Sequence, residues 1–513
     1  MFGEIGLGFQ AIFTPMMLAI VLAGTFLGLI AGGIPAMSGS TTVALLLPVT
    51  YQFGVIPSLA FLSSIYSAAT YGGSITAVLY NIPGAAPSIM TTLDGYPMSK
   101  QGKTREALAT AIFSSFTGGI IGCLLLLFFA PTLAQFAVNF AQPEYFALVL
   151  LGFSLITTVG REERIGNLVT LFLGLFLATI GMDLLDFGFR FASPSSPLSA
   201  GLDLLPIILG AFALPEVFTQ AEKGSAGAKL REQEKEGMTI PLLPNLDFYK
   251  RLWKNIFPTA MVGAVVGALP GAGASAGALF GYFTGRGISE KGNKFGTGIP
   301  EGISSPESAN NAACVTAYIP LLAFGIPGSG TTAILLGAFI LNGLNPGPML
   351  FVNQPQVAYS VIVALLVANL LIIVLNRFYL KTYTQIIKTP MSIFMPVVAV
   401  LCVVGSLASR TLMIDLYTVL IIGLLSYGLK KSGLSTSPLV IGFLLGSIGE
   451  RSLRTGLAAF NLQNFFIRPV TLVLLAGVVL IPIAARYIQE SEELERPEDE
   501  IEQKPENENK EES

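Results

Sequence analysis

Histidine is absent from this chain of 513 residues, and its absence removes much of the usual catalytic chemistry. Without histidine there is no Ser-His pair, no histidine-ligated zinc and no haem held by histidine. Ser329 in Gly328–Gly330 therefore has no histidine base, and neither a GxGD nor a DDxxD motif occurs. We expect that the protein is not an enzyme and that it holds no cofactor.

Charged residues are also scarce, at 12%, whereas soluble proteins usually carry about 25%. No charge occurs from Ile5 to Leu93 or from Ser308 to Asn376, and the mean hydropathy is +0.68. A transmembrane helix needs roughly 20 apolar residues, so each run can hold several passes. A β-barrel would show short alternating segments instead. The sequence therefore predicts an all-α polytopic membrane protein.

Cysteine is rare too. The three residues, Cys123, Cys314 and Cys402, lie far apart in apolar segments and form no CxxC pair. They are typical of small core residues and indicate no metal site.

The few charges divide the chain into parts. Residues 490–513 hold twelve acidic and three basic residues, which predicts a disordered acidic tail at 489–513. A polar linker at 222–250 separates a first membrane repeat, 1–221, from a second, 251–488. Lysine and arginine in and beside this linker favour its placement on the cytoplasmic side.

The two halves resemble one another. Gly28–Pro35 and Gly263–Pro270 share the pattern G-x-x-x-G-x-x-P, and Gly72–Leu79 matches Gly328–Leu335 at Gly, Thr, Ala and Leu. Paired apolar segments interrupted by glycine and proline are typical of transporters in which broken helices meet at the bilayer midplane. We therefore predict two inverted-repeat halves with broken helices and re-entrant hairpins.

Four clusters of helix breakers lie inside apolar sequence: Ile34–Thr42, Tyr71–Pro87, Leu269–Gly277 and Phe324–Thr332. Non-helical backbone survives at membrane depth only inside protein or beside a wet cavity. A broken helix offers free N–H groups and a positive dipole end to a carboxylate, and its carbonyls and nearby hydroxyls suit Na⁺. The alternative is that these small residues only permit close helix packing.

The predicted substrate- and ion-binding residues of these clusters are Ser38, Ser40, Gly72, Gly73, Ser74, Thr76, Asn81, Gly271, Gly273, Gly328, Ser329, Thr331 and Thr332. The prolines expected to fix the breaks are Pro35, Pro83, Pro270 and Pro327. A Na⁺ ion is predicted near Ser74, Thr76, Ser329 and Thr332.

A further polar stretch, Glu301–Ala313, stands at the edge of an uncharged run. Glu307 shares a helix face with Asn310 and Asn311, at spacings of three and four residues, and intramembrane polar residues are functional candidates. The alternative for Glu307 is a helix N-terminus with Pro306 in its first turn, which would leave the two asparagines unexplained.

The stretch Leu93–Leu108 contains Asp94, Gly95 and Pro97, which predict a turn. Lys100, Lys103 and Arg105 follow as a basic rim. This segment is either a solvated loop or a contact for an anion or a partner subunit.

Together these stretches resemble the TctA family, the large membrane subunit of tripartite tricarboxylate transporters. The resemblance rests on Tyr71–Lys103, Gly267–Ala274, Phe295–Ala313, Ile319–Phe339 and Asn345–Leu350. One departure is Pro35-Ala36-Met37-Ser38-Gly39, where the family usually reads Pro-Gly-Leu-Gly, as the second half does at Pro270–Gly273. Alanine reaches positive φ less readily than glycine, so this departure could alter the first-half loop.

The resemblance implies a multi-pass permease of the bacterial inner membrane that imports carboxylates, with citrate-like acids as the family expectation. It implies Na⁺ coupling, an elevator-type motion, a small TctB-like membrane subunit and a TctC-like extracytoplasmic solute-binding protein. The lipid bilayer is the remaining partner, and no nucleic acid is expected. The alternatives are a passive channel, or a scaffold or sensor subunit that transports nothing.

Overall fold

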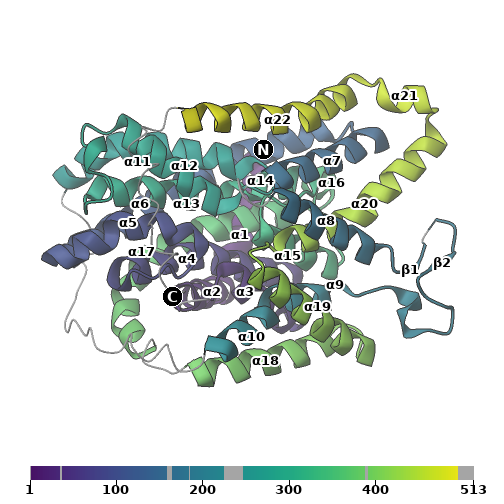
Figure 1. Ribbon diagram of the computed structural model, residues 1–513, viewed down its shortest axis with the longest axis horizontal. Helices are drawn as coiled ribbons and strands as arrows, with labels where there is room; N and C mark the ends of the chain where they lie inside the picture. The colour runs from purple at the N-terminus through teal and green to yellow at the C-terminus, as the bar shows by residue number, and fades with distance from the viewer. Residues whose placement is uncertain are drawn as a thin grey trace, which may run out of the picture.

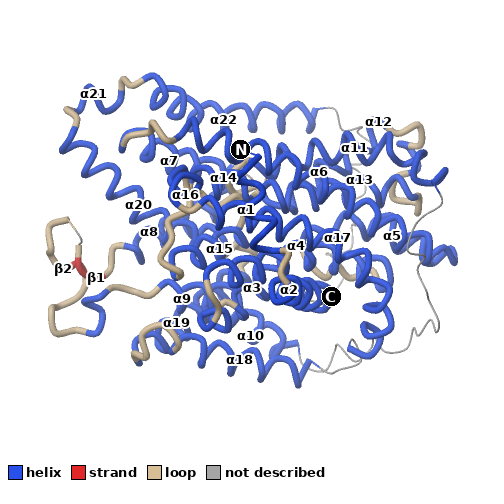
Figure 2. Tube along the Cα trace, turned by 180° about the vertical axis from the view of Figure 1, so that it is seen from behind, coloured by secondary structure: helices blue, strands red, loops and turns tan. Residues whose placement is uncertain are grey.

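The computed structural model describes residues 2–34, 37–158, 164–183, 185–223, 246–386 and 391–494, and these ranges are mostly helical (Figure 2). The helices up to residue 223 are α1 (Phe2–Ile12), α2 (Pro15–Gly33), α3 (Gly39–Leu46), α4 (Val55–Tyr80), α5 (Ile89–Met98), α6 (Thr104–Ala137), α7 (Gln142–Thr158), α8 (Arg164–Ala178), α9 (Leu204–Ile208) and α10 (Leu214–Lys223).

The helices from residue 246 onward are α11 (Leu246–Ala268), α12 (Gly273–Ile288), α13 (Pro300–Thr316), α14 (Tyr318–Phe324), α15 (Gly330–Leu341), α16 (Pro348–Asn353), α17 (Pro355–Ile386), α18 (Met391–Leu407), α19 (Met413–Lys431), α20 (Ser437–Ala459), α21 (Leu462–Phe466) and α22 (Pro469–Leu494). Short 3-10 turns include η2 (Ala86–Ser88), and a π-helical turn, η3 (Ser99–Lys103), joins α5 to α6.

Five of the described helical stretches are long and apolar enough to cross a membrane. They are Pro15–Gly33, Ala86–Ala137, Leu204–Glu222, Pro355–Asn376 and Met413–Lys431. A mostly helical chain with several such stretches matches the predicted polytopic membrane protein. Of the predicted linker, residues 224–245 lie outside the described residues, as do residues 495–513 of the predicted tail, while α22 continues to Leu494.

The centre of the molecule is α13, the helix formed by the polar stretch Glu301–Ala313. Every residue from Glu301 to Ala323 is buried. Helices α6, α11 and α12 pack closely around α13, because glycines face it: a Cβ at Gly118 would lie 2.0 Å from the Ser308 carbonyl oxygen, and one at Gly263 would lie 2.1 Å from that of Ala309. Small residues thus let backbones approach where the hydrophobic effect between helices is weak.

Two helices, one in each half, end in the same way. Asn81 caps α4 at φ 58° and Gly325 caps α14 at φ 73°, both left-handed conformations that few residues other than glycine and asparagine adopt. Ile-Pro-Gly follows each cap. The chain then turns into η2 and α5 in the first half and into α15 in the second.

One of the two sequence matches between the halves does not correspond to matching structure. Gly72–Leu79 lies inside the continuous helix α4, whereas Gly328–Leu335 begins α15, so the two segments occupy different settings. The break predicted within Tyr71–Pro87 starts only at Asn81. The segments with matching structure are Asn81–Gly84 and Gly325–Gly328. In the first half this segment lies beyond the Gly-Thr-Ala-Leu pattern.

The turn predicted at Asp94–Pro97 is wrong, since all four residues belong to α5. Asp94 is fully buried, and its carboxylate accepts N–H groups from the loop before α13. This tertiary contact holds Asp-Gly-Tyr-Pro helical against its local preference for a turn.

The strands of the described residues form one small hairpin, β1 (Gly181–Met182) and β2 (Phe189–Arg190), paired antiparallel. Most of the long helices run along the long axis of the molecule, with the hairpin projecting at one end and α5 lying at the other (Figure 1). Ion pairs of Arg190 and Arg454 with Asp183 and Glu450 fasten the hairpin to α20.

Candidate functional site

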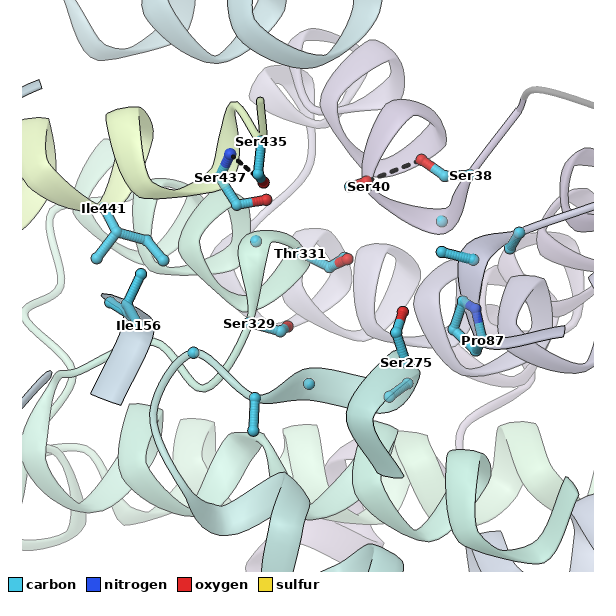
Figure 3. A pocket seen from close by; sticks show the side chains of 18 of the residues that line it. Ser38, Ser40, Pro87, Ile156, Ser275, Ser329, Thr331, Ser435, Ser437 and Ile441 are labelled. Carbon is cyan, nitrogen blue, oxygen red and sulfur yellow. Dashed lines mark hydrogen bonds between the residues drawn. The ribbon is translucent and has the colours of Figure 1, made fainter. Parts of the chain in front are cut away.

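The breaks from both halves meet around one cavity of about 360 Å³. Its wall includes Ser38–Ser40 and Ala85–Pro87 from the first half and Gly271–Ser275 and Ser329–Thr331 from the second. Figure 3 shows the side chains of Ser38, Ser40, Ser275, Ser329 and Thr331 grouped around it. The remaining wall residues are Tyr66, Thr70, Ile156, Asn167, Ser435, Ser437, Pro438 and Ile441.

Four α-helices begin at this cavity. The first residues of α3, α12, α15 and α20 all contribute to its wall. The first N–H groups of a helix have no partner inside the helix, and the aligned peptide dipoles place roughly half a positive charge at this end. No Asp, Glu, Lys or Arg is among the described residues of the wall. The cavity therefore presents backbone N–H groups and hydroxyls, without charged side chains among its described wall residues.

Local sequence explains two of these helix starts. Ser329 forms a capping box with Thr332: its Oγ accepts the Thr332 N–H at 3.2 Å, and the Ser329 N–H donates to Thr332 Oγ1 at 2.7 Å. Ser38 caps α3 by accepting the Thr41 N–H at 3.2 Å and lies 2.8 Å from Ser40 Oγ. Both caps hold their hydroxyls at the cavity.

Contacts between the breaks fix the wall. The Gly271 N–H donates to the Gly328 carbonyl at 3.0 Å, and Gly271 has φ 85°, where a side chain would be strained. Tyr66 on α4 places its hydroxyl 3.3 Å from Ser329 Oγ. First-half and second-half segments thus build a single wall.

A second polar centre, outside the cavity wall, lies around Glu307 in the interior of α13. Its carboxylate accepts three hydroxyl groups from three helices: Ser74 of α4 at 2.6 Å, Ser115 of α6 at 2.7 Å, and Thr91 of α5. We name the Glu307 carboxylate with these three hydroxyls the Glu307 cage. Since α13 begins at Pro300, the alternative reading of Glu307 as a helix N-terminus is wrong.

The two asparagines of α13 contact each other rather than the cavity. Asn311 Nδ2 donates to Asn310 Oδ1 at 2.6 Å and to the Glu307 carbonyl at 3.3 Å, and both side chains are buried. The Asn310 side chain interacts with the Glu307 carboxylate. Asn310 and Asn311 therefore belong to the surroundings of Glu307.

The predicted site residues thus fall into two groups. Those at the cavity are Ser38, Ser40, Gly271, Gly273, Ser329 and Thr331. Those on α4, at its cap and on α13, outside the cavity wall, are Gly72, Gly73, Ser74, Thr76, Asn81, Glu307, Asn310 and Asn311. Gly328 packs on Ala317, and Thr332 caps α15. Among the prolines, Pro83, Pro270 and Pro327 lie in the breaks, and Pro35 lies outside the described residues.

The four hydroxyls predicted to share a Na⁺ ion lie in separate places. Ser329 and Thr332 bond each other at the start of α15, beside Tyr66. Ser74 lies eight residues beyond Tyr66 on α4, about 12 Å along a helix at 1.5 Å per residue. Ser74 instead bonds Glu307, and Thr76 bonds the Gly73 carbonyl.

The sequence reading missed several residues that the structure brings in. Ser435 and Ser437 belong to the cavity wall because they stand at the start of α20. Pro438, near the first helical position, is a sequence signal that could have located this helix start. Thr91 and Ser115 reach Glu307 from α5 and α6. No local motif marks these two hydroxyls, since only the packing of helices brings them to the carboxylate.

Comparison with known proteins gives a consistent result. Residues 18–441 match the model of the "Tripartite tricarboxylate transporter TctA family". An uncharacterized 52.8 kDa protein in the TAR-I ttuC' 3'region of Agrobacterium vitis is 33% identical over 488 residues, covering 94% of this chain and 95% of that protein. An uncharacterized protein in the TAR-II ttuC' 3'region is 32% identical over 206 residues, 40% of this chain and 85% of that protein. No solved structure matches.

Proposed function

Since the chain belongs to the TctA family, the large membrane subunit of tripartite tricarboxylate transporters, we propose that it imports carboxylates across the bacterial inner membrane as a Na⁺-coupled secondary permease. The family is a transporter family and not an enzyme family. Citrate-like tricarboxylates are the substrate class that the family suggests.

The observation that carries this proposal is the convergence of four helix starts on a cavity without charged side chains. A carboxylate at a helix N-terminus gains about 0.3–1 kcal/mol when exposed and up to about 2 kcal/mol when partly buried. Several such ends, with serine and threonine hydroxyls between them, favour a small anion with more than one carboxylate group. The volume of about 360 Å³ lies within the usual range for small-ligand sites.

Coupling to a cation follows from the charge of such a substrate. Importing an anion against a membrane potential costs about 2.3 kcal/mol per charge for each 100 mV. Cations that move with the anion offset this cost. Na⁺ suits the all-oxygen groups that the breaks supply.

The arrangement also supports inverted-repeat halves that move as an elevator. The left-handed caps at Asn81 and Gly325, each followed by Ile-Pro-Gly, place Ala85–Pro87 and Ser329–Thr331 at the same cavity. In this proposal the substrate arrives from a TctC-like solute-binding protein, a TctB-like subunit completes the membrane complex, and the linker at 222–250 lies in the cytoplasm.

The test is uptake of labelled citrate and related carboxylates into proteoliposomes that hold this chain and its small membrane partner. We expect accumulation only with an inward Na⁺ gradient and the binding protein. Ser275→Trp should fill the cavity and abolish uptake. The matched variant Leu279→Trp, one turn further along α12 and outside the cavity wall, should keep it.

Other outcomes would contradict the proposal. Equilibration that needs neither gradient nor binding protein would indicate a passive channel. Uptake that Ser275→Trp leaves unchanged would remove the cavity from the transport path. Absence of flux across the whole carboxylate panel, with both partners present, would favour a scaffold or sensor subunit.

A further inference from the structure

Glu307 differs from the other buried acidic residues of the described chain. Glu144, Glu216, Glu301 and Asp415 each form an ion pair with a lysine or arginine. Asp94 accepts three backbone N–H groups and the Tyr282 hydroxyl. The Glu307 carboxylate instead accepts three hydroxyl groups, with the neutral Asn310 amide beside it, and the structure gives Glu307 no basic partner among the described residues.

In its ionised form Glu307 places a negative charge, without a basic partner among the described residues, in the centre of the molecule. Taking an ion out of water into a protein interior costs several kcal/mol unless an opposite charge offsets it. Glu307 is 0% exposed, and its neighbours in the cage are neutral. A cation that enters the cage would remove this cost.

The cage has the composition of a Na⁺ site. It brings together five oxygen atoms, two from Glu307 and one each from Ser74, Thr91 and Ser115. They come from four helices, α13, α4, α5 and α6. Hard cations prefer carboxylate and neutral oxygen ligands.

We propose that the Glu307 cage binds Na⁺ and that this ion holds α4 and α5 against α13. This inference rests on the proposed function in naming the ion that is coupled to transport. The proposed Na⁺ position therefore includes Ser74 but not Ser329 and Thr332, whose hydroxyls cap α15 at the cavity.

The same two helices connect the cage to the cavity. Ser74 lies one helical turn beyond Thr70, which belongs to the cavity wall. Thr91 lies four residues beyond Pro87, another wall residue, and Ser88 between them places its Oγ 3.4 Å from Ser74 Oγ. Na⁺ in the cage therefore fixes the wall at Thr70 and Pro87 before an anion arrives. Substrate affinity should rise with Na⁺, and Na⁺ affinity should rise equally with substrate.

The first experiment measures Na⁺ alone, without any carboxylate. The thermal unfolding midpoint of the purified full chain is followed as NaCl replaces choline chloride at constant ionic strength and pH. A ligand that binds only the folded state raises the midpoint in a saturable manner. We expect this rise in the wild type and its loss in Glu307→Gln, which keeps the shape of the side chain without the charge.

Two matched pairs keep the test informative if Glu307→Gln does not fold. Thr91→Val and Ser115→Ala each remove one cage hydroxyl, and each should raise the half-saturating Na⁺ concentration roughly tenfold. Their neighbours provide controls, because the Thr92 hydroxyl bonds the Ile89 carbonyl and Ser114 Oγ contacts no hydrogen-bond partner. Thr92→Val and Ser114→Ala should therefore leave the Na⁺ response unchanged.

The outcomes separate this inference from the proposed function. A Na⁺-induced rise that is the same in Thr91→Val, Ser115→Ala and the wild type would overturn the cage assignment, even if carboxylate uptake is Na⁺-driven. Uptake driven by a pH gradient in Na⁺-free buffer would contradict both the Na⁺ coupling of the proposed function and the role of the cage in that coupling. A Na⁺ response that requires Glu307, in a chain that transports no carboxylate, would support the site and contradict the proposed substrate.

Discussion

At the scale of single residues, the structure depends on close approaches that only glycine permits. Asp94 is held at 2.9–3.1 Å by the N–H groups of Gly296, Gly298 and Ile299, from the loop that leads into α13. Gly302, in the first turn of α13, lies directly beside this carboxylate. The contact joins α5 of the first half to the central helix of the second.

We predict that Gly302→Ala lowers the thermal unfolding midpoint, because its Cβ would lie 2.0 Å from Asp94 Oδ2. Overpacking of this kind costs about 1–3 kcal/mol. Gly287→Ala, in α12 and with no atom within 4 Å of the added Cβ, should instead stabilise by about 0.5–1 kcal/mol. Equal midpoints for the two variants would contradict the close approach at Asp94.

At the scale of elements, the left-handed helix ends are the clearest link between the halves. Asn81 and Gly325 end α4 and α14 with φ of 58° and 73°. The segments that follow these two ends, Ala85–Pro87 and Ser329–Thr331, both line the cavity. The backbone conformation at each position should therefore limit which residues are tolerated there.

Asn81→Ala should destabilise the protein by about 1–2 kcal/mol, the cost of a left-handed conformation for an L-residue with a Cβ. Gly325→Ala should cost more, because its Cβ would also lie 2.6 Å from the Pro346 carbonyl oxygen. Asn81→Gly should be nearly neutral, since glycine adopts this conformation freely. Chemical denaturation in detergent measures these differences. An Asn81→Gly variant as unstable as Asn81→Ala would show that the Asn81 side chain, and not its backbone angle, matters.

The β1–β2 hairpin is a second element, and ion pairs stabilise its position against α20. The Leu185 N–H, at 2.8 Å, and the Arg454 guanidinium hold the pKa of Asp183 well below its usual range. The usual carboxyl pKa of an unfolded aspartate is about 3.9. Because the folded pKa is lower, Asp183 contributes stability above about pH 4, and this contribution is lost only as the pH falls further.

We therefore expect Arg454→Gln to speed hydrogen exchange in residues 181–190, since Arg454 bonds Asp183 and Glu450. Lowering the pH from about 7 to about 5 should not release the hairpin in the wild type, because Asp183 stays ionised. Arg451→Gln, an exposed neighbour on α20, is the matched control. The exchange rates are corrected for the intrinsic effect of pH on amide exchange. Faster corrected exchange of the wild-type hairpin at pH 5 than at pH 7 would contradict this account.

Sequence patterns predicted the helices and their breaks better than the tertiary contacts between them. Uncharged runs indicated membrane helices, and the breaks near Pro83, Pro270 and Pro327 were located. The patterns failed at Asp94, where a tertiary contact stabilises a helix, and at Gly72–Leu79, which stays inside α4. The convergence of Ser74, Thr91 and Ser115 on Glu307 depends on helix packing, which no local spacing records.

At the scale of the whole molecule, segments from the two ends of the sequence share one cavity. Ser38 and Ser437 are separated by most of the chain, yet both belong to its wall. A carrier must expose such a cavity to each side of the membrane in turn. A channel would expose it to both sides at once.

A single cysteine at Ser275, in a chain lacking Cys123, Cys314 and Cys402, should report this exchange. We expect an impermeant maleimide to label it from either face of a vesicle, and a bound carboxylate with Na⁺ to slow the labelling. Ser432→Cys, at the exposed end of α19, should label from one face only and ignore substrate. Labelling of Ser275→Cys from one face alone under all conditions would contradict alternating access.

In the proposed function the cavity attracts anions through helix starts, and this has a consequence for how such permeases diversify. Peptide dipoles do not depend on side-chain identity, so the field persists through any substitution that keeps α3, α12, α15 and α20 in place. The hydroxyls of Ser40, Ser275, Thr331 and Ser437 can then change without loss of that field. Descendants of one fold could exchange one cargo acid for another by a few point mutations, with the electrostatics inherited unchanged.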